Sequence, residues 1–347
     1  MINLLLFFVG LILLVKGSIY TVKYSSSLAK RFGVSEFVIG LTLVAIGTSL
    51  PELVSSIVAS LKNAPAIIIG NIVGANIANI TLVVGLAAIM SRLVIKKEII
   101  MRDSYMLLTC VLLFILVIID KKISFIEGVF FILFYFVYLV FIFQSKKTLK
   151  GKYGFKEFIP YFFNLEYLIT FKNFFTKHIK YKSSSNKNRK IKHFLYWLII
   201  KDILIIILSL SAVIYGANLM IERAIYFAEL YSFPKFLIGI LISLGTTAPE
   251  MTVSISAARK GFGNLAIGNA IGSVIVNTLF ILGCASLISP IKIAEGNFLF
   301  VILALVFFSL TFFAIINVKK EISKFDGIIL IILYLIFLIW TLIRQAI

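Results

Sequence analysis

Two glutamates lie in the middle of long apolar segments, and each follows a closely similar short motif. Glu52 follows Gly-Thr-Ser-Leu-Pro, and Glu250 follows Gly-Thr-Thr-Ala-Pro. An ionised carboxylate near the centre of a bilayer costs roughly 2.5–3.5 kcal/mol on insertion scales, so a repeated pair needs a compensating interaction. A bound cation supplies one, and a protonated glutamate bonded to a neighbouring helix is the alternative. The repetition favours the cation.

Hydroxyl side chains precede each glutamate at helical spacing. Positions at i, i+3, i+4 and i+7 share one face of a helix. Pro51 and Pro249 have no N–H, so the carbonyls of Gly47 and Gly245 lose their helical partners and become further oxygen ligands. The faces expected to present oxygens are Ala45, Thr48, Ser49 and Glu52 in the first motif, and Ser243, Thr246, Thr247 and Glu250 in the second.

Amide side chains recur in the segment after each motif. At spacings of i, i+4 and i+8 these segments carry Asn71, Ala75 and Asn79, and then Asn269, Ser273 and Asn277. They are expected to form the opposite wall of a site. Calcium takes about six to eight hard oxygens, and two carboxylates match its charge. The same site would also hold two or more sodium ions. Zinc, copper and iron are disfavoured because both histidines, His178 and His193, lie far from the motifs.

The two motif regions are copies of one another. Residues 47–79 align with residues 245–277 at a constant offset of 198 residues, with 14 of 33 positions identical and no gap. The identical positions include the glycines, the proline, the glutamate and two asparagines. Inverted repeats with interrupted helices that meet at the midplane are typical of secondary transporters.

The segments that carry these motifs are expected to be transmembrane helices. The chain is 61% hydrophobic and 14% charged, whereas a soluble domain carries about 25% charged residues. Because about 20 apolar residues span a bilayer, the pattern predicts an all-α membrane protein with ten transmembrane helices, arranged as two inverted five-helix repeats. The predicted spans are residues 2–24, 36–60, 66–90, 104–119, 124–143, 196–222, 235–258, 265–288, 297–317 and 327–343.

Lysine and arginine gather in alternate connectors, which predicts that both termini lie outside the cell. The predicted organisation is a first repeat over 1–143, a basic cytoplasmic loop over 144–195 and a second repeat over 196–347. Of the 34 basic residues, 13 lie in this loop, so the net charge of +19 reflects topology and not nucleic-acid binding. The loop mixes lysine with aromatic residues, and is either an interfacial helix on anionic lipid or a disordered tether.

The blocks GTSLPEL with GNIVGANIAN, and GTTAPEM with GNAIGSVIVN, resemble the two signature repeats of the cation/calcium exchanger superfamily, especially prokaryotic sodium/calcium exchangers. The resemblance implies that Glu52 and Glu250 are shared by calcium and sodium, and that the first and sixth spans slide. It also implies ligand roles for Thr48, Ser49, Thr246 and Thr247, sodium sites at the carbonyls of Ala45 and Ser243, and a central site lined by Ser273, Asn79 and Asn277.

Two positions depart from the family pattern. Some relatives, including the potassium-dependent branch, carry aspartate where Asn277 stands, so Asn277 argues against potassium dependence. Ala75 replaces the usual serine, which removes one possible ligand.

These features predict a plasma-membrane antiporter that exchanges Ca²⁺ for Na⁺ by alternating access. It would have no cofactor besides the transported ions and no enzymatic activity. The alternative is a Ca²⁺/H⁺ antiporter of the same fold, because two glutamates can also carry protons. A passive channel is disfavoured by the repeat, and an intramembrane metal enzyme by the lack of histidine ligands and of a repeated nucleophile.

Overall fold

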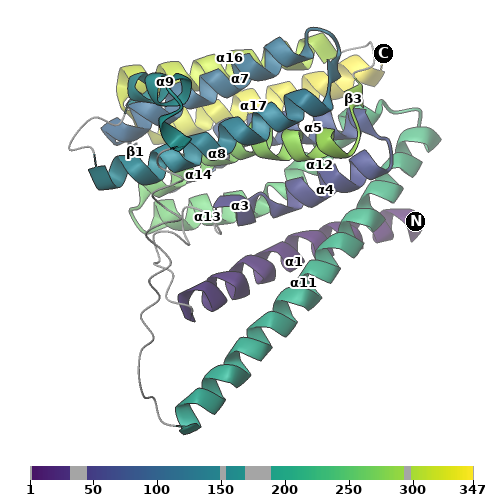
Figure 1. Ribbon diagram of the computed structural model, residues 1–347. Helices are drawn as coiled ribbons and strands as arrows, with labels where there is room; N and C mark the ends of the chain where they lie inside the picture. The colour runs from purple at the N-terminus through teal and green to yellow at the C-terminus, as the bar shows by residue number, and fades with distance from the viewer. Residues whose placement is uncertain (1, 32–44, 149–153, 169–188, 293–297, 347) are drawn as a thin grey trace.

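The computed structural model is a bundle of helices (Figure 1). It describes residues 2–31, 45–148, 154–168, 189–292 and 298–346. Within these ranges, nine helical stretches are long and apolar enough to cross a membrane. They coincide with nine of the ten predicted spans. The remaining span, 36–60, is described only from Ala45 onward, because residues 32–44 lie outside the described ranges.

The chain before the basic loop forms one series of elements. In order these are α1 (Ile2–Arg31), α3 (Ala45–Thr48), α4 (Leu50–Leu61), α5 (Pro65–Ala78), the π-helical turn η2 (Asn79–Val83), α6 (Val84–Met90), strand β1 (Leu93–Val94), the π-helical turn η3 (Ile99–Asp103), α7 (Ser104–Ile118), strand β2 (Lys122–Ile123) and α8 (Phe125–Thr148).

The chain from the loop onward forms a second series. It comprises α9 (Phe155–Phe163), α11 (Arg189–Leu230), α12 (Lys235–Thr246), α13 (Ala248–Arg259), α14 (Gly263–Ile275), the π-helical turn η4 (Val276–Ile281), α15 (Leu282–Ile288), strand β3 (Ile291–Lys292), α16 (Phe298–Lys319), strand β4 (Glu321–Ile322) and α17 (Lys324–Ala346).

Both motif helices are interrupted at the motif itself. The first breaks at Ser49, between α3 and α4, and the second at Thr247, between α12 and α13. Pro51 and Pro249 stand in the first turn of the helix that follows, where a missing N–H costs nothing. The sequence predicted that the residues before each glutamate lie on one face of a continuous helix. That prediction is wrong in detail, because one helix ends before each glutamate and a new helix begins there.

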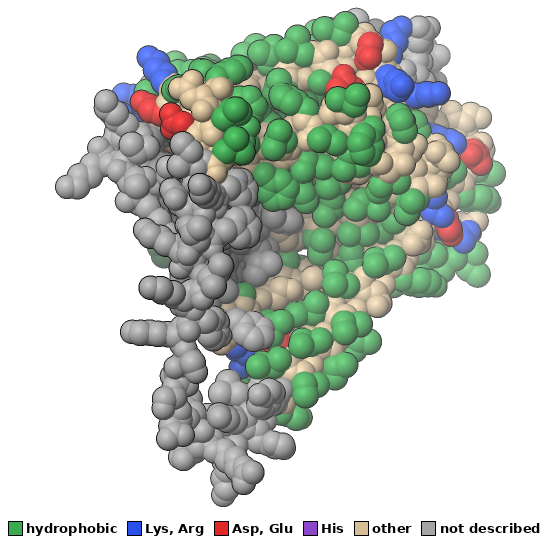
Figure 2. Space-filling model, viewed as in Figure 1, with side chains coloured by type: hydrophobic (Ala, Val, Ile, Leu, Met, Phe, Trp, Pro, Cys, Tyr) green, Lys and Arg blue, Asp and Glu red, His purple; other side chains and the backbone are tan. Residues whose placement is uncertain are grey.

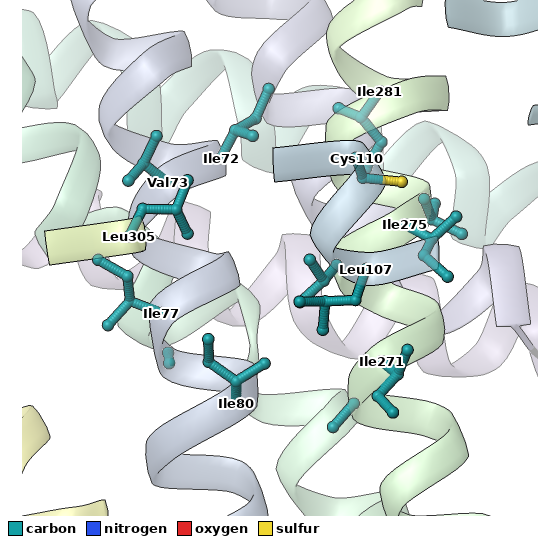
Figure 3. Close-up of a cluster of buried hydrophobic side chains, with 14 of the residues drawn as sticks. Ile72, Val73, Ile77, Ile80, Leu107, Cys110, Ile271, Ile275, Ile281 and Leu305 are labelled. Carbon is teal, nitrogen blue, oxygen red and sulfur yellow. The ribbon is translucent and has the colours of Figure 1, made fainter. Parts of the chain in front are cut away.

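The helices after the motifs form the centre of the molecule. Over their most apolar stretches, 83% of the residues are buried between Pro65 and Met90 and 72% between Gly263 and Ile288. Figure 3 shows apolar side chains of α5 and α14, such as Ile72 and Ile271, in a cluster that also contains Cys110 of α7 and Leu305 of α16. The outer surface is mostly hydrophobic in the view of Figure 2, as expected for a lipid-facing protein.

Helices α1 and α11 run side by side along one flank of the bundle (Figure 1). Both are longer than predicted: α11 has 42 residues, about 63 Å at 1.5 Å per residue. They cross closely at Gly10 and Gly216, where a Cβ on Gly10 would lie 2.8 Å from the carbonyl oxygen of Gly216. In their most apolar stretches only 22% of α1 and 17% of α11 is buried, so the pair is peripheral.

Short strands and glycine pairs link the chain before the loop to the chain after it. Strand β1 pairs antiparallel with β4, and β2 pairs antiparallel with β3. Gly85 of α6 meets Gly327 of α17, and Gly128 of α8 meets Gly283 of α15. In each glycine pair an added Cβ would lie 3.0 Å or less from the partner's carbonyl oxygen. These helices therefore pack with their backbones in contact.

Helix α9 lies in the described part of the basic loop and docks on the protein, while α8 continues into the predicted loop as far as Thr148 and α11 already begins at Arg189. Phe158 and Tyr161 of α9 are buried. The ring of Phe158 contacts Phe134, Tyr138 and Phe141 of α8 with centroid distances of 5.4–5.6 Å. The helix predicted as interfacial is thus present over residues 155–163, and its contact with lipid stays a prediction. Residues 169–188 of the loop lie outside the described ranges.

Candidate cation site

Each glutamate is placed in the first turn after a helix break and is buried. Glu52 of α4 is 1% exposed and Glu250 of α13 is 0% exposed. Among the described residues, neither carboxylate oxygen of Glu52 has a hydrogen-bond partner, and Oε2 of Glu250 also has none. A buried carboxylate without partners is strongly unfavourable unless a positive charge or a proton compensates it. The geometry therefore leaves three carboxylate oxygens available to a ligand.

Hydroxyl groups of each motif lie beside the glutamate of the other motif. The Ser49 hydroxyl donates a hydrogen bond of 3.0 Å to Oε1 of Glu250 and lies 3.4 Å from the Ser273 hydroxyl. Thr48 also lies beside Glu250, while Thr246 lies beside Glu52. This reciprocal arrangement brings both motifs into one cluster of oxygens.

The backbone before the second break is engaged in local hydrogen bonds. The Ser243 carbonyl accepts from the backbone N–H of Thr247 at 3.0 Å and from its hydroxyl at 2.8 Å. The Ser243 hydroxyl donates to the carbonyl of Ile240. In the other motif, Ala45 begins α3, and the structure does not describe its side chain. To act as a cation ligand, the Ser243 carbonyl would have to give up the hydrogen bonds that it accepts from Thr247.

A second polar layer lies at the two π-helical turns. Asn79 begins η2 and Asn277 lies in η4, and both are fully buried. Asn277 Nδ2 donates to Asn76 Oδ1 at 3.2 Å, and Asn76 Nδ2 donates to Thr278 Oγ1 at 2.9 Å. Within the described chain, the side-chain amide of Asn79 and the Oδ1 atom of Asn277 have no partner. These two asparagines therefore present unsatisfied polar atoms, as a ligand site requires.

Asn76 belongs to this buried polar layer, and the sequence pattern missed it. It stands outside the i, i+4, i+8 spacing, and the position equivalent to it in the second copy is Val274. A repeat comparison cannot find a residue that only one copy carries. The only available signal was a third polar side chain in the GNIVGANIAN block.

Asn71 and Asn269 act mainly as links between neighbouring helices. Asn71 Nδ2 donates to Ser55 at 3.1 Å and to Ser56 at 3.3 Å, which ties α5 to α4. Asn269 Nδ2 donates to Ser254 at 3.1 Å and ties α14 to α13 in the equivalent way. Thr246 Oγ1 also lies 3.4 Å from Asn71 Oδ1. The amides predicted to form a wall therefore hold the glutamate helices in place.

The donor set consists of hard oxygens in a buried environment. Carboxylates come from Glu52 and Glu250, hydroxyls from both motifs and amides from the following helices. Within the described ranges, no three histidine, cysteine, aspartate or glutamate side chains lie close enough together to hold a metal ion between them. Such a set suits calcium and sodium and does not suit metals that prefer nitrogen or sulfur ligands.

Comparison with known proteins gives a consistent family assignment. The model of the family described as "Sodium/calcium exchanger protein" matches residues 2–144 and 201–343. The "Sodium/calcium exchanger MaX1" of Methanosarcina acetivorans is 41% identical over 97% of this chain and 98% of its own length. An uncharacterized membrane protein of Methanocaldococcus jannaschii is 32% identical over 95% of both chains.

Solved structures of the sodium-calcium exchanger NCX_Mj show the same fold. One, soaked with 2.5 mM Na⁺ and 10 mM Sr²⁺, has a TM-score of 0.55 at 30% identity, covering 96% of this chain and 97% of its own. The apolar helices and these relatives identify a multi-pass membrane protein that is a transporter and not an enzyme. The chain belongs to the sodium/calcium exchanger protein family.

Proposed function

We propose that this protein is a secondary antiporter that exchanges Ca²⁺ for Na⁺ across the plasma membrane, by alternating access at a midplane site. The observation that carries this proposal is the pair of buried glutamates, one from each motif copy, together with the hydrogen bond from Ser49 of the first motif to Glu250 of the second. Thr48, Thr246, Thr247, Ser273, Asn79 and Asn277 would complete the site. The carbonyls of Ala45 and Ser243 would serve sodium.

The cross-links of the fold support an arrangement of two inverted five-helix repeats, 1–143 and 196–347. The connectors that carry β1 and β3 are equivalent in the two repeats, yet β1 pairs with β4 and β3 pairs with β2. The glycine pairs are crossed in the same way: Gly85 and Gly283 are equivalent positions 198 residues apart, and each meets a glycine of the other half. A two-fold axis that relates the two halves would explain both the strand pairing and the glycine pairing. With the charge bias, it supports termini outside and residues 144–195 in the cytoplasm.

Competition for the same carboxylates would couple the two ions. Either one Ca²⁺ or two Na⁺ would neutralise Glu52 and Glu250, so that calcium leaves as sodium loads and the reverse. An empty site would keep two buried charges, and moving it through the membrane would be unfavourable, which suppresses uncoupled leak. The peripheral pair α1 and α11 would slide along the central helices and open the site to each side in turn.

The basic loop would hold the cytoplasmic surface to anionic lipid. Helix α9 is docked by Phe158 and Tyr161, while Ile159 and Phe163 are 45% and 75% exposed. An apolar exposed face with lysine nearby is typical of an interfacial helix.

The decisive experiment is calcium-45 uptake into proteoliposomes with Na⁺, K⁺ or H⁺ gradients imposed one at a time. We expect uptake with an outward Na⁺ gradient and none with K⁺ alone. Uptake driven by a pH gradient without sodium would instead identify a Ca²⁺/H⁺ antiporter. Calcium flux that needs no counter-ion would overturn antiport altogether.

A further inference from the structure

Lys16 is a basic residue at the midpoint of α1, and the cation site does not account for it. Helix α1 is about 45 Å long, against a hydrocarbon core of about 30 Å, so Lys16 falls within the membrane-spanning part. Its side chain is exposed, and no hydrogen bond or ion pair joins it to another residue of the described ranges. A lysine at this depth is costly, roughly 2.5–3.5 kcal/mol on insertion scales, unless something compensates the charge.

The Lys16 side chain lines a cavity between α1 and α11. The cavity measures about 290 Å³, and its other walls include Ile12 and Tyr20 of α1 and Leu208 of α11. These three side chains are 58%, 48% and 69% exposed, so the cavity is a groove on the outer face of the helix pair. An apolar groove on this face is open to lipid acyl chains, and Lys16 adds one positive charge to it.

A ladder of polar groups leads from Lys16 toward the C-terminal end of α1. Tyr20 and Tyr24 follow Lys16 at successive spacings of four residues, on the same face of the helix. Their rings stack with a centroid distance of 6.4 Å, and the Lys23 ammonium lies 5.7 Å from the centre of the Tyr24 ring. Tyrosine and lysine in this order are typical of the level where a helix meets lipid head groups.

We propose that this groove binds an anionic phospholipid. One acyl chain lies along Ile12 and Leu208, and the phosphate is held by the Lys16 ammonium and the Tyr20 hydroxyl. The flexible stem of Lys16 allows its ammonium to reach toward the head-group level. The positive charge selects an anionic lipid, and the apolar walls select an amphiphile over a soluble anion.

The test is native mass spectrometry of the full-length protein with phosphatidylglycerol or phosphatidylcholine of matched chains. We expect phosphatidylglycerol to be retained by the wild type and at least fivefold less by the Lys16→Met variant. Lys260→Met, which removes an exposed lysine outside the groove, should retain it fully. Lys16→Arg should retain it as well, because the charge is kept.

Three outcomes would overturn the proposal. Equal retention of phosphatidylglycerol by Lys16→Met would remove the role of the charge. Equal retention of phosphatidylcholine by the wild type would indicate a plain acyl groove. Displacement of phosphatidylglycerol by oleate at equal concentration would indicate a free fatty acid site. Melting temperatures of the variants confirm that they are folded, and Met is compatible with a lipid-facing position, so a folding failure is not expected.

Discussion

The hydroxyl of Ser49 donates a hydrogen bond of 3.0 Å to Oε1 of Glu250, across 201 positions of the chain. Ser49 stands at the break of the first motif helix, and Glu250 in the first turn after the break of the second. Each motif therefore contributes to the surroundings of the other's glutamate, and neither forms a complete site by itself.

Removal of either glutamate charge should abolish exchange. Each of the variants Glu52→Gln and Glu250→Gln keeps only one carboxylate, so the charge of a bound Ca²⁺ is only half balanced in a site of low dielectric. Sodium-driven calcium uptake should fall by at least about 10-fold, since about 1.4 kcal/mol of lost binding already gives that factor. Glu229→Gln, at an exposed position near the end of α11, should transport normally. Normal calcium flux in either motif variant would refute the site.

Loss of the Ser49 hydroxyl should weaken calcium binding without destroying the fold. Ser49→Ala removes a donor to a carboxylate, and a hydrogen bond to a charged group contributes about 1.5–3 kcal/mol. We expect the apparent KM for calcium to rise at least tenfold in proteoliposome uptake, while Ser49→Thr stays close to the wild type. If Ser49→Ala leaves the KM unchanged, the contact between the motifs is not part of the transport site.

Asn76 should act through Asn277, whose amide it orients. Asn76→Ala removes the acceptor at 3.2 Å, so the Asn277 amide can turn its Nδ2 group toward the site. We expect a higher KM for calcium, with Asn218→Ala, a half-buried asparagine of α11 that among the described residues bonds only to the Ile214 carbonyl, as the unaffected control. The informative variant combines Asn76→Ala with Asn277→Ala. If Asn76 only positions Asn277, the double variant should resemble Asn277→Ala, whereas additive losses would show an independent role.

Two glycines at equivalent motif positions should differ in their tolerance of alanine. A Cβ on Gly70 would clash with the carbonyl oxygen of Phe236 and lie 3.0 Å from Gly239 Cα, whereas a Cβ on Gly268 meets no described atom within 4 Å. Overpacking costs about 1–3 kcal/mol, so Gly70→Ala should lower the melting temperature by several degrees. Gly268→Ala should be neutral or stabilising, because alanine favours helix. Equal shifts in thermal unfolding would contradict the close packing of α5 on α12.

The sequence predicted most of the helices and the burial of both glutamates, while the ligand site itself stays a prediction. Long apolar segments identify spans because composition alone decides whether a helix can remain in lipid. The repeat identified Glu52 and Glu250 because both copies keep the same polar and helix-breaking residues. The burial of the glutamates and the convergence of both motifs agree with that prediction.

Other features could not be obtained from the pattern, for identifiable reasons. The breaks at Ser49 and Thr247 depend on backbone angles that proline permits but does not fix. The π-helical turns at Asn79 and Val276 result from one extra residue in the hydrogen-bond ladder, which leaves the apolar pattern nearly unchanged. Lys16 was missed because a long apolar run tolerates one charge, and Asn76 because its partners, Asn277 and Thr278, are distant in the chain.

The crossed pairing of the strands has a consequence for how such a chain could arise. Strands β1 and β2 have no partner in their own series, and each pairs with a strand from the other. A single ancestral unit would have left these edges unpaired until it met a second unit inserted the opposite way. If the two halves are inverted repeats, as proposed above, gene fusion would then have joined the two units of an antiparallel dimer. The two halves expressed as separate polypeptides should accordingly be inert alone and should reassemble when produced together.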